Sequence, residues 1–287
     1  PDHCRPHAVR RHLGRVLNSL RTASGIIVNS RATAHDLAGF AARLRLRLPP
    51  VLAAHLAGAP LSPSGRPAPE QRPYFLCVGT IESRKNHILL LRIWQKLVAR
   101  AGGADIPRLV LIGQWGAYSE PVRELLRRDP QLARHVAVLD HCHDAEMADW
   151  IRSARAVLLP TMAEGFGLPL VEAMALGTPV IASDLPCFRE IGQGIPLLLP
   201  PDDEAAWEAA ITLQAAAALE AQRRLLPGFR KPTWADHFAQ VDHWLEETVL
   251  GRQKVPEPER AEAGHAHPPF APAFASAQSG LILERAS

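Results

Sequence analysis

The sequence contains few of the residues that mark several common protein classes. Its 287 residues include four cysteines without paired spacing, which favours reduced thiols over a disulfide framework. No apolar run approaches about 18 residues, and no charged-then-apolar leader opens the chain. We therefore expect no membrane-spanning helix and a cytoplasmic location, with peripheral contact at the inner face of the membrane as the alternative. A formal net charge of +3 is too small to indicate nucleic-acid binding.

Short apolar runs alternate with helical patterns through most of the chain. Because each run is nearly continuous rather than alternating, we predict an α/β fold with a doubly wound parallel sheet. A single Ala- and Leu-rich helix is predicted over 205–225, and one opening at Ser83 or Asn86 follows the first strand. The predicted strands are 74–78, 109–112, 136–139, 156–159, 179–182 and 194–199.

The composition also indicates how the chain is divided. An Arg-rich amphipathic helix is predicted over 8–23, and it fits a solvated surface better than an anionic membrane. A short strand follows at 25–30, and Ser30 is suited to cap the helix that begins at Arg31. The predicted divisions are an N-terminal domain remnant (1–59), a Pro-, Ser- and Gly-rich linker (60–73), a ligand-binding domain (74–232), a last helix (233–250) and a disordered tail (251–287).

The segment EGFGLPLVE at 164–172 carries the strongest chemical signal. It follows a predicted strand and passes through a glycine loop into a short helix. Gly165 and Gly167 let a ligand approach the backbone, and a helix N-terminus favours a diphosphate or sugar oxygens. Glu164 and Glu172, at the two ends of the segment, can accept hydrogen bonds from a hydroxyl-rich ligand. The plain alternative for either glutamate is an exposed residue of a strand–helix turn.

A second motif, GTIESRKNH at 79–87, follows the first strand of the ligand-binding domain. The turn at Gly79 precedes two cations, Arg84 and Lys85, at a helix start. Cations there oppose the helix dipole, so we expect a ligand phosphate to compensate them, with a solvated helix end as the alternative. Since the carboxyl ends of parallel strands lie together, Lys85, Glu164 and Glu172 are predicted to converge on one pocket.

Other chemistry-bearing residues give weaker signals. The run HCHD at 141–144 does not have metal-ligand spacing, because neighbouring side chains point apart, so no metal is expected. Asp144 is predicted to cap the following helix. Cys187 has no implied histidine partner and is not expected to act as a nucleophile. A dinucleotide-binding site is rejected, because Gly79 stands alone where three glycines are required.

The two motifs together, with AMALGTPV at 173–180 and GIIVNSRATAHDL at 25–37, resemble family 4 glycosyltransferases of the GT-B fold. The resemblance implies retention of anomeric configuration, no metal and no cofactor. It also implies that a loop at 185–190 closes the cleft and that the terminal helix crosses back onto the first domain. Thr80 stands where the family often has arginine, and Arg84 is the replacement expected in mannosyltransferase-like members. The implied roles are contact to the donor sugar for Glu164, to the ribose for Glu172, to the diphosphate for Lys85 and Arg84, and to the base for the backbone at Cys142. The glycine loop Gly165, Phe166 and Gly167 is expected to meet the sugar and phosphates. Gly79, Thr80 and Leu168 are further expected donor-binding residues.

The expected function is transfer of a sugar from a nucleotide-sugar to a glycan or lipid-linked acceptor. A GDP-sugar such as GDP-mannose is favoured, with a UDP-sugar next. Members of this family usually carry about 150 further residues that build the acceptor side of the cleft, which is one domain's worth. The alternative is therefore a nucleotide-sugar-binding remnant without activity. Signatures of epimerases or phosphorylases of the same fold are not evident.

Overall fold

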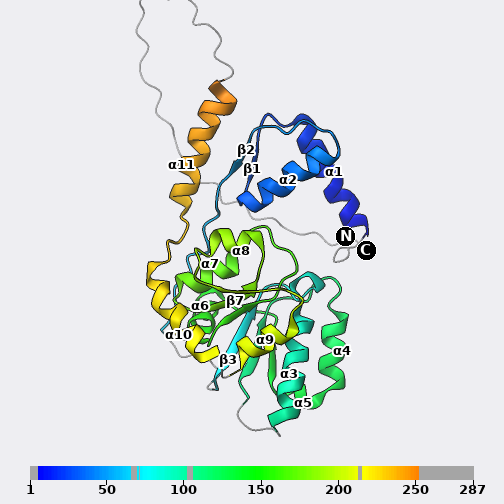
Figure 1. Cartoon of the computed structure of the whole chain (residues 1–287), viewed down its shortest axis with the longest axis vertical. Helices are drawn as coiled ribbons and strands as arrows, with labels where there is room; N and C mark the ends of the chain where they lie inside the picture. The colour runs from blue at the N-terminus through cyan, green and yellow to red at the C-terminus, as the bar shows by residue number, and fades with distance from the viewer. Residues whose placement is uncertain (1–5, 66–69, 71, 102–105, 213–214, 252–287) are drawn as a thin grey trace, which may run out of the picture. The chain divides into compact units, whose positions relative to one another are not determined.

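The structure, a computed structural model, describes residues 6–65, 70, 72–101, 106–212 and 215–251, all within one compact unit. Its centre is a six-stranded parallel sheet with the strand order β5-β4-β3-β6-β7-β8. Figure 1 shows this sheet, with β3 and β7 labelled, among its helices. Long apolar runs form these strands because helices cover both faces of the sheet. The strands are β3 (Tyr74–Val78), β4 (Arg108–Ile112), β5 (Val136–Leu139), β6 (Val157–Leu159), β7 (Val180–Ser183) and β8 (Leu197–Leu199).

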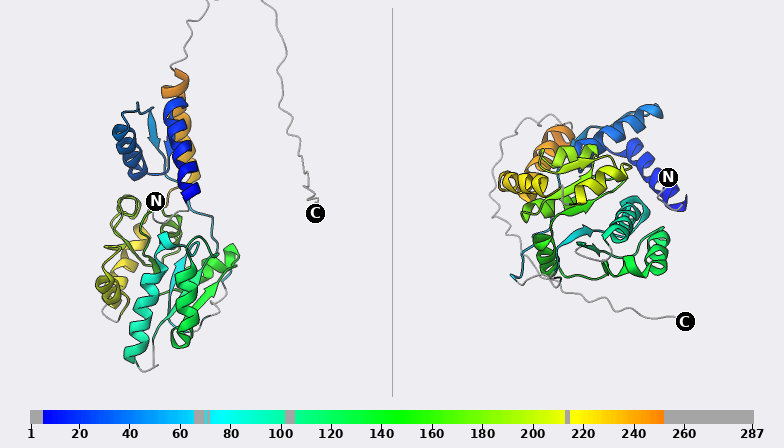
Figure 2. Two further views of the ribbon diagram at one scale, coloured as in Figure 1. Left: turned by 90° about the vertical axis from the view of Figure 1, so that its right-hand side faces the viewer. Right: turned by 60° about the horizontal axis from the view of Figure 1, so that its bottom comes forward.

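Alternate residues of each strand enter two separate hydrophobic cores. Tyr74 and Leu76 face the core that contains α6, α7 and α8, whereas Phe75 and Cys77 face the core that contains α3, α4 and α9. Figure 2 shows α3 and α4 side by side on their face of the sheet. The helices are α3 (His87–Ala101), α4 (Glu120–Arg128), α5 (Pro130–Ala133), α6 (Asp144–Ser153), α7 (Leu168–Ala175), α8 (Pro186–Ile191), α9 (Glu204–Ile211), α10 (Ala215–Leu225) and α11 (Trp234–Trp244).

The N-terminal part forms a small parallel pair of strands with two helices. β1 (Ile26–Val28) pairs with β2 (Val51–Ala53), and the flanking helices are α1 (Pro6–Thr22) and α2 (Arg31–Arg43). The predicted cap is confirmed, because the Ser30 hydroxyl accepts a hydrogen bond from the Thr33 N–H. None of the helices within the described residues combines the length and the apolar character that a membrane-spanning segment requires.

The topology creates a switch point between β3 and β6, where the direction in which successive strands are added to the sheet reverses. β3 pairs with β4 on one side and with β6 on the other, and the chain adds its later strands outward from both. The connections that leave β3 and β6 therefore diverge to opposite faces. In doubly wound sheets, ligands bind outside the carboxyl ends of strands at such a switch point. The loops after β3 and β6 are the two that carry the predicted motifs.

Several predicted elements differ from the structure. The predicted 205–225 helix is two helices, since α9 ends at Ile211 and α10 begins at Ala215. The Ala-rich composition of both helices concealed the break. The segment predicted as a loop at 185–190 is largely helix α8, where Pro186 occupies the first turn. The cap of α6 is His143 rather than Asp144, which is the first helical residue.

Further differences concern α5 and the C-terminal part of the chain. Helix α5 was not predicted, and Asp129 caps it by accepting from the Leu132 N–H. The last predicted helix, 233–250, is α11 followed by a π-helical turn at Leu245–Leu250. The predicted disordered tail lies outside the described residues, apart from Gly251. The divisions at 59, 73 and 232 stay predictions.

The ends of β3 and β4 approach closely because of a glycine. A Cβ atom added at Gly113 would lie 2.1 Å from the Gly79 carbonyl oxygen. That oxygen belongs to the backbone, so it cannot rotate away as a side chain would. The turn after β3, which leads to Lys85, depends on this contact.

We expect Gly113→Ala to lower the free energy of unfolding by on the order of 1–3 kcal/mol, because overpacked sites force the backbone to shift. Gly39→Ala is the matched control, since a Cβ there meets nothing within 4 Å inside α2. That variant should gain about 0.5–1 kcal/mol by the loss of glycine's flexibility in a helix. Urea unfolding measures both changes, and equal effects would contradict the steric argument.

Candidate functional site

Two loops meet at the switch point and are bonded backbone to backbone. The loop after β3 contains the short 3₁₀ turn Ser83–Lys85, and the loop after β6 runs through residues 160–167. The Arg84 carbonyl accepts hydrogen bonds from the Met162 N–H (2.8 Å) and from the Thr161 hydroxyl (3.1 Å). Asn86 ends the turn in the left-handed region, at φ 55°, so that α3 can start in a new direction. Lys85 is therefore held at the front of the second loop.

Lys85 and Glu164 form the central ion pair of the site. The Lys85 Nζ lies 2.5 Å from the Glu164 Oε2, and their side chains are only 15% and 17% exposed. Burial alone would raise the pKa of Glu164, but the hydrogen bond and charge of Lys85, together with Arg84, lower that pKa below its ordinary value. The carboxylate is thus ionised at neutral pH, and it takes one of the three N–H donors of the ammonium group.

Arg84 connects the two loops through its side chain. One guanidinium nitrogen donates to the Ala163 carbonyl (2.7 Å) and lies 3.2 Å from the Glu164 carboxylate, while the other donates to Glu82 (2.7 Å). In this geometry Arg84 braces the loop that carries Glu164. Its predicted contact with phosphate stays a prediction.

The start of α7 is packed too tightly for any side chain at Gly167. This residue caps the helix at φ 102°, and an added Cβ would lie 2.3 Å from the buried ring of Phe188. The Cys187 thiol, on the same helix α8, donates to the Glu164 carbonyl at 3.2 Å. Helix α8 therefore supports the glycine loop. Its helical form was not predicted, because α8 is short and begins with proline.

A small pocket opens between these loops. Its lining includes Lys85, Glu164, Thr161, Gly167 and Phe188. Lys85, Glu164 and Thr161 supply the polar groups of a small cavity whose lining is otherwise mostly apolar. A cation, a carboxylate and a hydroxyl can together hydrogen-bond the phosphate oxygens and hydroxyl groups of a ligand. Thr161 was missed by sequence reasoning, because a threonine after a strand has no distinctive spacing.

Glu172 does not share this pocket. It lines a separate cavity with Gly58, Ala59 and Lys231, and its carboxylate accepts a hydrogen bond from the Ala59 N–H at 3.2 Å. Burial raises its pKa above the ordinary value, against the hydrogen bond from Ala59 and the charge of Lys231. The structure thus brings Lys85 and Glu164 together and places Glu172 in a separate cavity beside the 58–61 segment.

The other predicted site residues occupy several environments. Phe166 is 3% exposed and its ring packs against His55, so its side chain is buried and its backbone is the part that a ligand could contact. Leu168 and Thr80 are exposed. Cys142 is half-buried, and burial raises the pKa of its thiol to about 11. No group of three His, Cys, Asp or Glu residues that could hold a metal occurs within the described ranges.

Comparison with known proteins identifies the class. The family described as Glycosyl transferases group 1 matches residues 72–215, which is half of the chain. The chain therefore belongs to this family of glycosyltransferases, in agreement with the resemblance to family 4. The match covers the whole region from β3 to α9, including both loops of the site.

Two curated bacterial relatives are mannosyltransferases. The chain is 37% identical over 121 residues to the serotype-specific mannosyltransferase WbdA of Escherichia coli, which covers 42% of this chain and 14% of that protein. It is 32% identical over 145 residues to the O-antigen chain mannosyltransferase RfbU of Salmonella typhimurium, which covers 50% of this chain and 38% of that protein. The chain thus spans well under half the length of these relatives.

The fold is shared with solved structures at lower identity. The sucrose-phosphate synthase of Thermosynechococcus elongatus superposes with a TM-score of 0.63 at 21% identity, over 83% of this chain and 62% of that one. At such identity the likeness shows the fold alone. It confirms the predicted GT-B-type doubly wound sheet.

We expect the ion pair of Glu164 to appear in the pH dependence of stability. Its folded-state pKa lies below the ordinary value of 4.5, so its stabilising contribution is present above pH 4.5 and is lost as the pH falls through the folded value. The free energy of unfolding of the wild type, minus that of Glu164→Gln, should therefore shrink on acidification. Urea unfolding between pH 7 and 3 measures the difference.

Glu172→Gln supplies a comparison of opposite sign. Because the folded-state pKa of Glu172 is raised, its contribution is present below pH 4.5 and is lost as the pH rises through the folded value. Wild type minus Glu172→Gln should thus grow on acidification. Two differences that change in the same direction would contradict the assigned environments.

Proposed function

We propose that the chain contributes the donor site of a glycosyltransferase that moves a sugar from a nucleoside-diphosphate sugar to a glycan or lipid-linked acceptor. The observation that carries the proposal is the buried contact between Lys85 and Glu164 in a glycine-lined pocket at the switch point. Membership of the glycosyltransferase group 1 family supports it. The reaction is proposed to retain the anomeric configuration and to need no metal or other cofactor.

Lys85 is the proposed electrostatic partner of the diphosphate. Its ammonium keeps two N–H donors beyond the one that Glu164 accepts, and both can point at phosphate oxygens. When the bond between sugar and phosphate breaks, negative charge grows on the diphosphate. A fixed cation in a water-poor site stabilises that charge without reorganising, which lowers the barrier to transfer.

Glu164 is the proposed sugar-orienting residue. Its lowered pKa keeps it ionised at neutral pH, so its free lone pairs can accept hydrogen bonds from sugar hydroxyls. Arg84 and the Cys187 thiol hold the two ends of the residue, side chain and backbone. Such fixed orientation of a reactant lowers the entropic part of the barrier.

Glu172 is the proposed ribose contact, in the cavity that Gly58 and Lys231 also line. A contact to ribose changes little during bond cleavage, so it contributes to binding rather than to turnover. The names of WbdA and RfbU support a mannosyl donor, and GDP-mannose is the donor that we propose, with a UDP-sugar as the next candidate.

We expect calorimetric titration of the chain to detect binding of GDP-mannose. Lys85→Ala should weaken that binding by on the order of 10- to 100-fold, because charge-assisted hydrogen bonds are lost. Glu164→Ala should lower turnover, measured as release of GDP, by on the order of 100-fold with a smaller effect on KM. Glu172→Ala should weaken the binding of GDP and of GDP-mannose by the same factor.

Glu124→Ala is the control for these variants, because Glu124 pairs with Arg127 and Arg128 on the exposed side of α4. It should bind and turn over like the wild type. Absence of heat with GDP-mannose, GDP, UDP-glucose and UDP would overturn the proposed function. Binding without turnover in every variant, wild type included, would favour the binding-protein alternative.

A further inference from the structure

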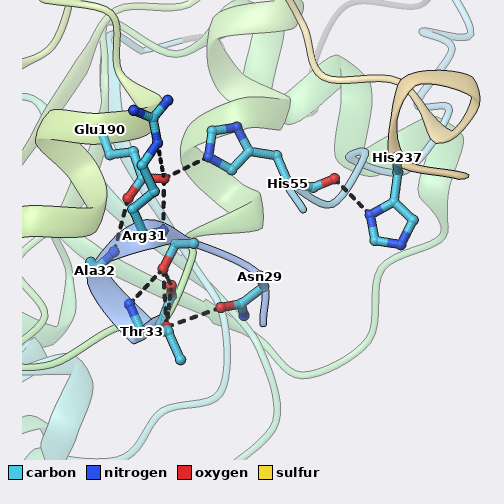
Figure 3. A network of polar contacts seen from close by, with 9 residues as sticks. Asn29, Arg31, Ala32, Thr33, His55, Glu190 and His237 are labelled. Atoms are coloured by element: carbon cyan, nitrogen blue, oxygen red, sulfur yellow. Dashed lines mark hydrogen bonds and ion pairs between the residues drawn. The ribbon is translucent and has the colours of Figure 1, made fainter. Parts of the chain in front are cut away.

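The N-terminus of α2 contacts the glycine loop directly, although the two are 135 residues apart in the sequence. The Ser30 hydroxyl donates to the Gly165 carbonyl at 2.6 Å, and the Thr33 hydroxyl lies 3.2 Å from the same oxygen. The Thr33 hydroxyl is also 3.0 Å from the Asn29 side-chain oxygen, as Figure 3 shows. Ser30 is completely buried.

Glu190 holds this helix end from the other side. Its two carboxylate oxygens accept hydrogen bonds from the Arg31 N–H (2.9 Å) and the Ala32 N–H (3.0 Å), and His55 Nε2 lies 2.7 Å from the first of them (Figure 3). A carboxylate at this position also complements the positive end of the helix dipole. Burial opposes ionisation of Glu190, but these contacts lower its pKa below the ordinary value.

The first N–H groups of α2 are consequently all satisfied. Glu190 accepts the first two, the Ser30 hydroxyl accepts that of Thr33, and the Ser30 carbonyl accepts that of Ala34. At a helix start these donors have no partner within the helix and must be satisfied by groups outside it. Here the bonds come from α8 and from the cap residue that also binds the glycine loop. We call Ser30, Thr33 and Glu190 the α2 clamp.

We propose that the α2 clamp positions the glycine loop, and through it Glu164, for contact with the donor sugar; this inference rests on the proposed function. Gly165 follows Glu164 directly, so a shift of its carbonyl moves the carboxylate. None of Ser30, Thr33 and Glu190 is among the residues that line the pocket or form the Lys85–Glu164 ion pair, so they act through the loop as positioning residues. Small displacements of a positioned group cost large factors in rate.

The test uses variants that remove the hydroxyl contacts. In Ser30→Ala/Thr33→Val, we expect the ratio of the Kd for GDP to the Kd for GDP-mannose to fall by about five- to tenfold, which is the usual effect of losing one or two hydrogen bonds. The Kd for GDP alone should change less than about twofold, because the clamp does not support the diphosphate contact. Amide hydrogen exchange across residues 163–167 should become faster.

Two variants serve as controls. Thr33→Ser keeps the hydroxyl and should retain the wild-type ratio. Thr212→Val makes the same change as Thr33→Val at the end of α9, where the hydroxyl donates only within its own helix turn. It should leave both the ratio and the loop exchange unchanged.

The outcomes separate this inference from the proposed function. A double variant with the wild-type ratio and wild-type loop exchange, in a chain that binds both ligands, would overturn the clamp and leave the proposed function intact. A wild-type chain that binds neither ligand would overturn both. Equal weakening for GDP and GDP-mannose would indicate a general loss of structure and would also overturn the positioning role.

Discussion

The pairing of Lys85 with Glu164 is the interaction on which the rest of the site depends. A buried cation or a buried carboxylate alone would be costly, and the ion pair compensates each charge with the other. Lys85 comes from the loop after β3 and Glu164 from the loop after β6. The pair therefore forms at the switch point, where these two neighbouring strands end side by side. The fold thus creates the site by bringing two outgoing loops together.

Much of this arrangement follows from local patterns in the sequence. β3 and β5 occupy the predicted ranges, because buried parallel strands are continuous apolar runs with clear ends. The meeting of Lys85 and Glu164 also follows, since parallel strands present their carboxyl ends together. The strand–helix alternation was enough to predict the α/β class.

What the sequence could not reveal depends on contacts between distant segments. Helix α8 has six residues, too few to show a helical repeat of apolar positions in the sequence. Its packing through Phe188 against Gly167 could therefore not be predicted. Glu172 was expected beside Lys85. It lies about one turn inside α7, however, and its side chain points toward Ala59 instead of toward the glycine loop. Ser30 was predicted as a helix cap, which is a local role; its bond to Gly165 required the folded chain.

The α2 clamp binds the main-chain oxygen of Gly165, so the anchoring of the loop does not depend on which side chains the loop carries. A bond to a carbonyl does not distinguish between side chains, and a Cβ at Gly165 would meet Asn29 and Thr33 at an ordinary 3.5 Å. The residues around the loop can therefore be exchanged, by natural drift or by an engineer grafting another sugar preference, while the anchorage persists. The main chain of this short segment anchors the loop, whereas its side chains are free to determine which sugar is bound.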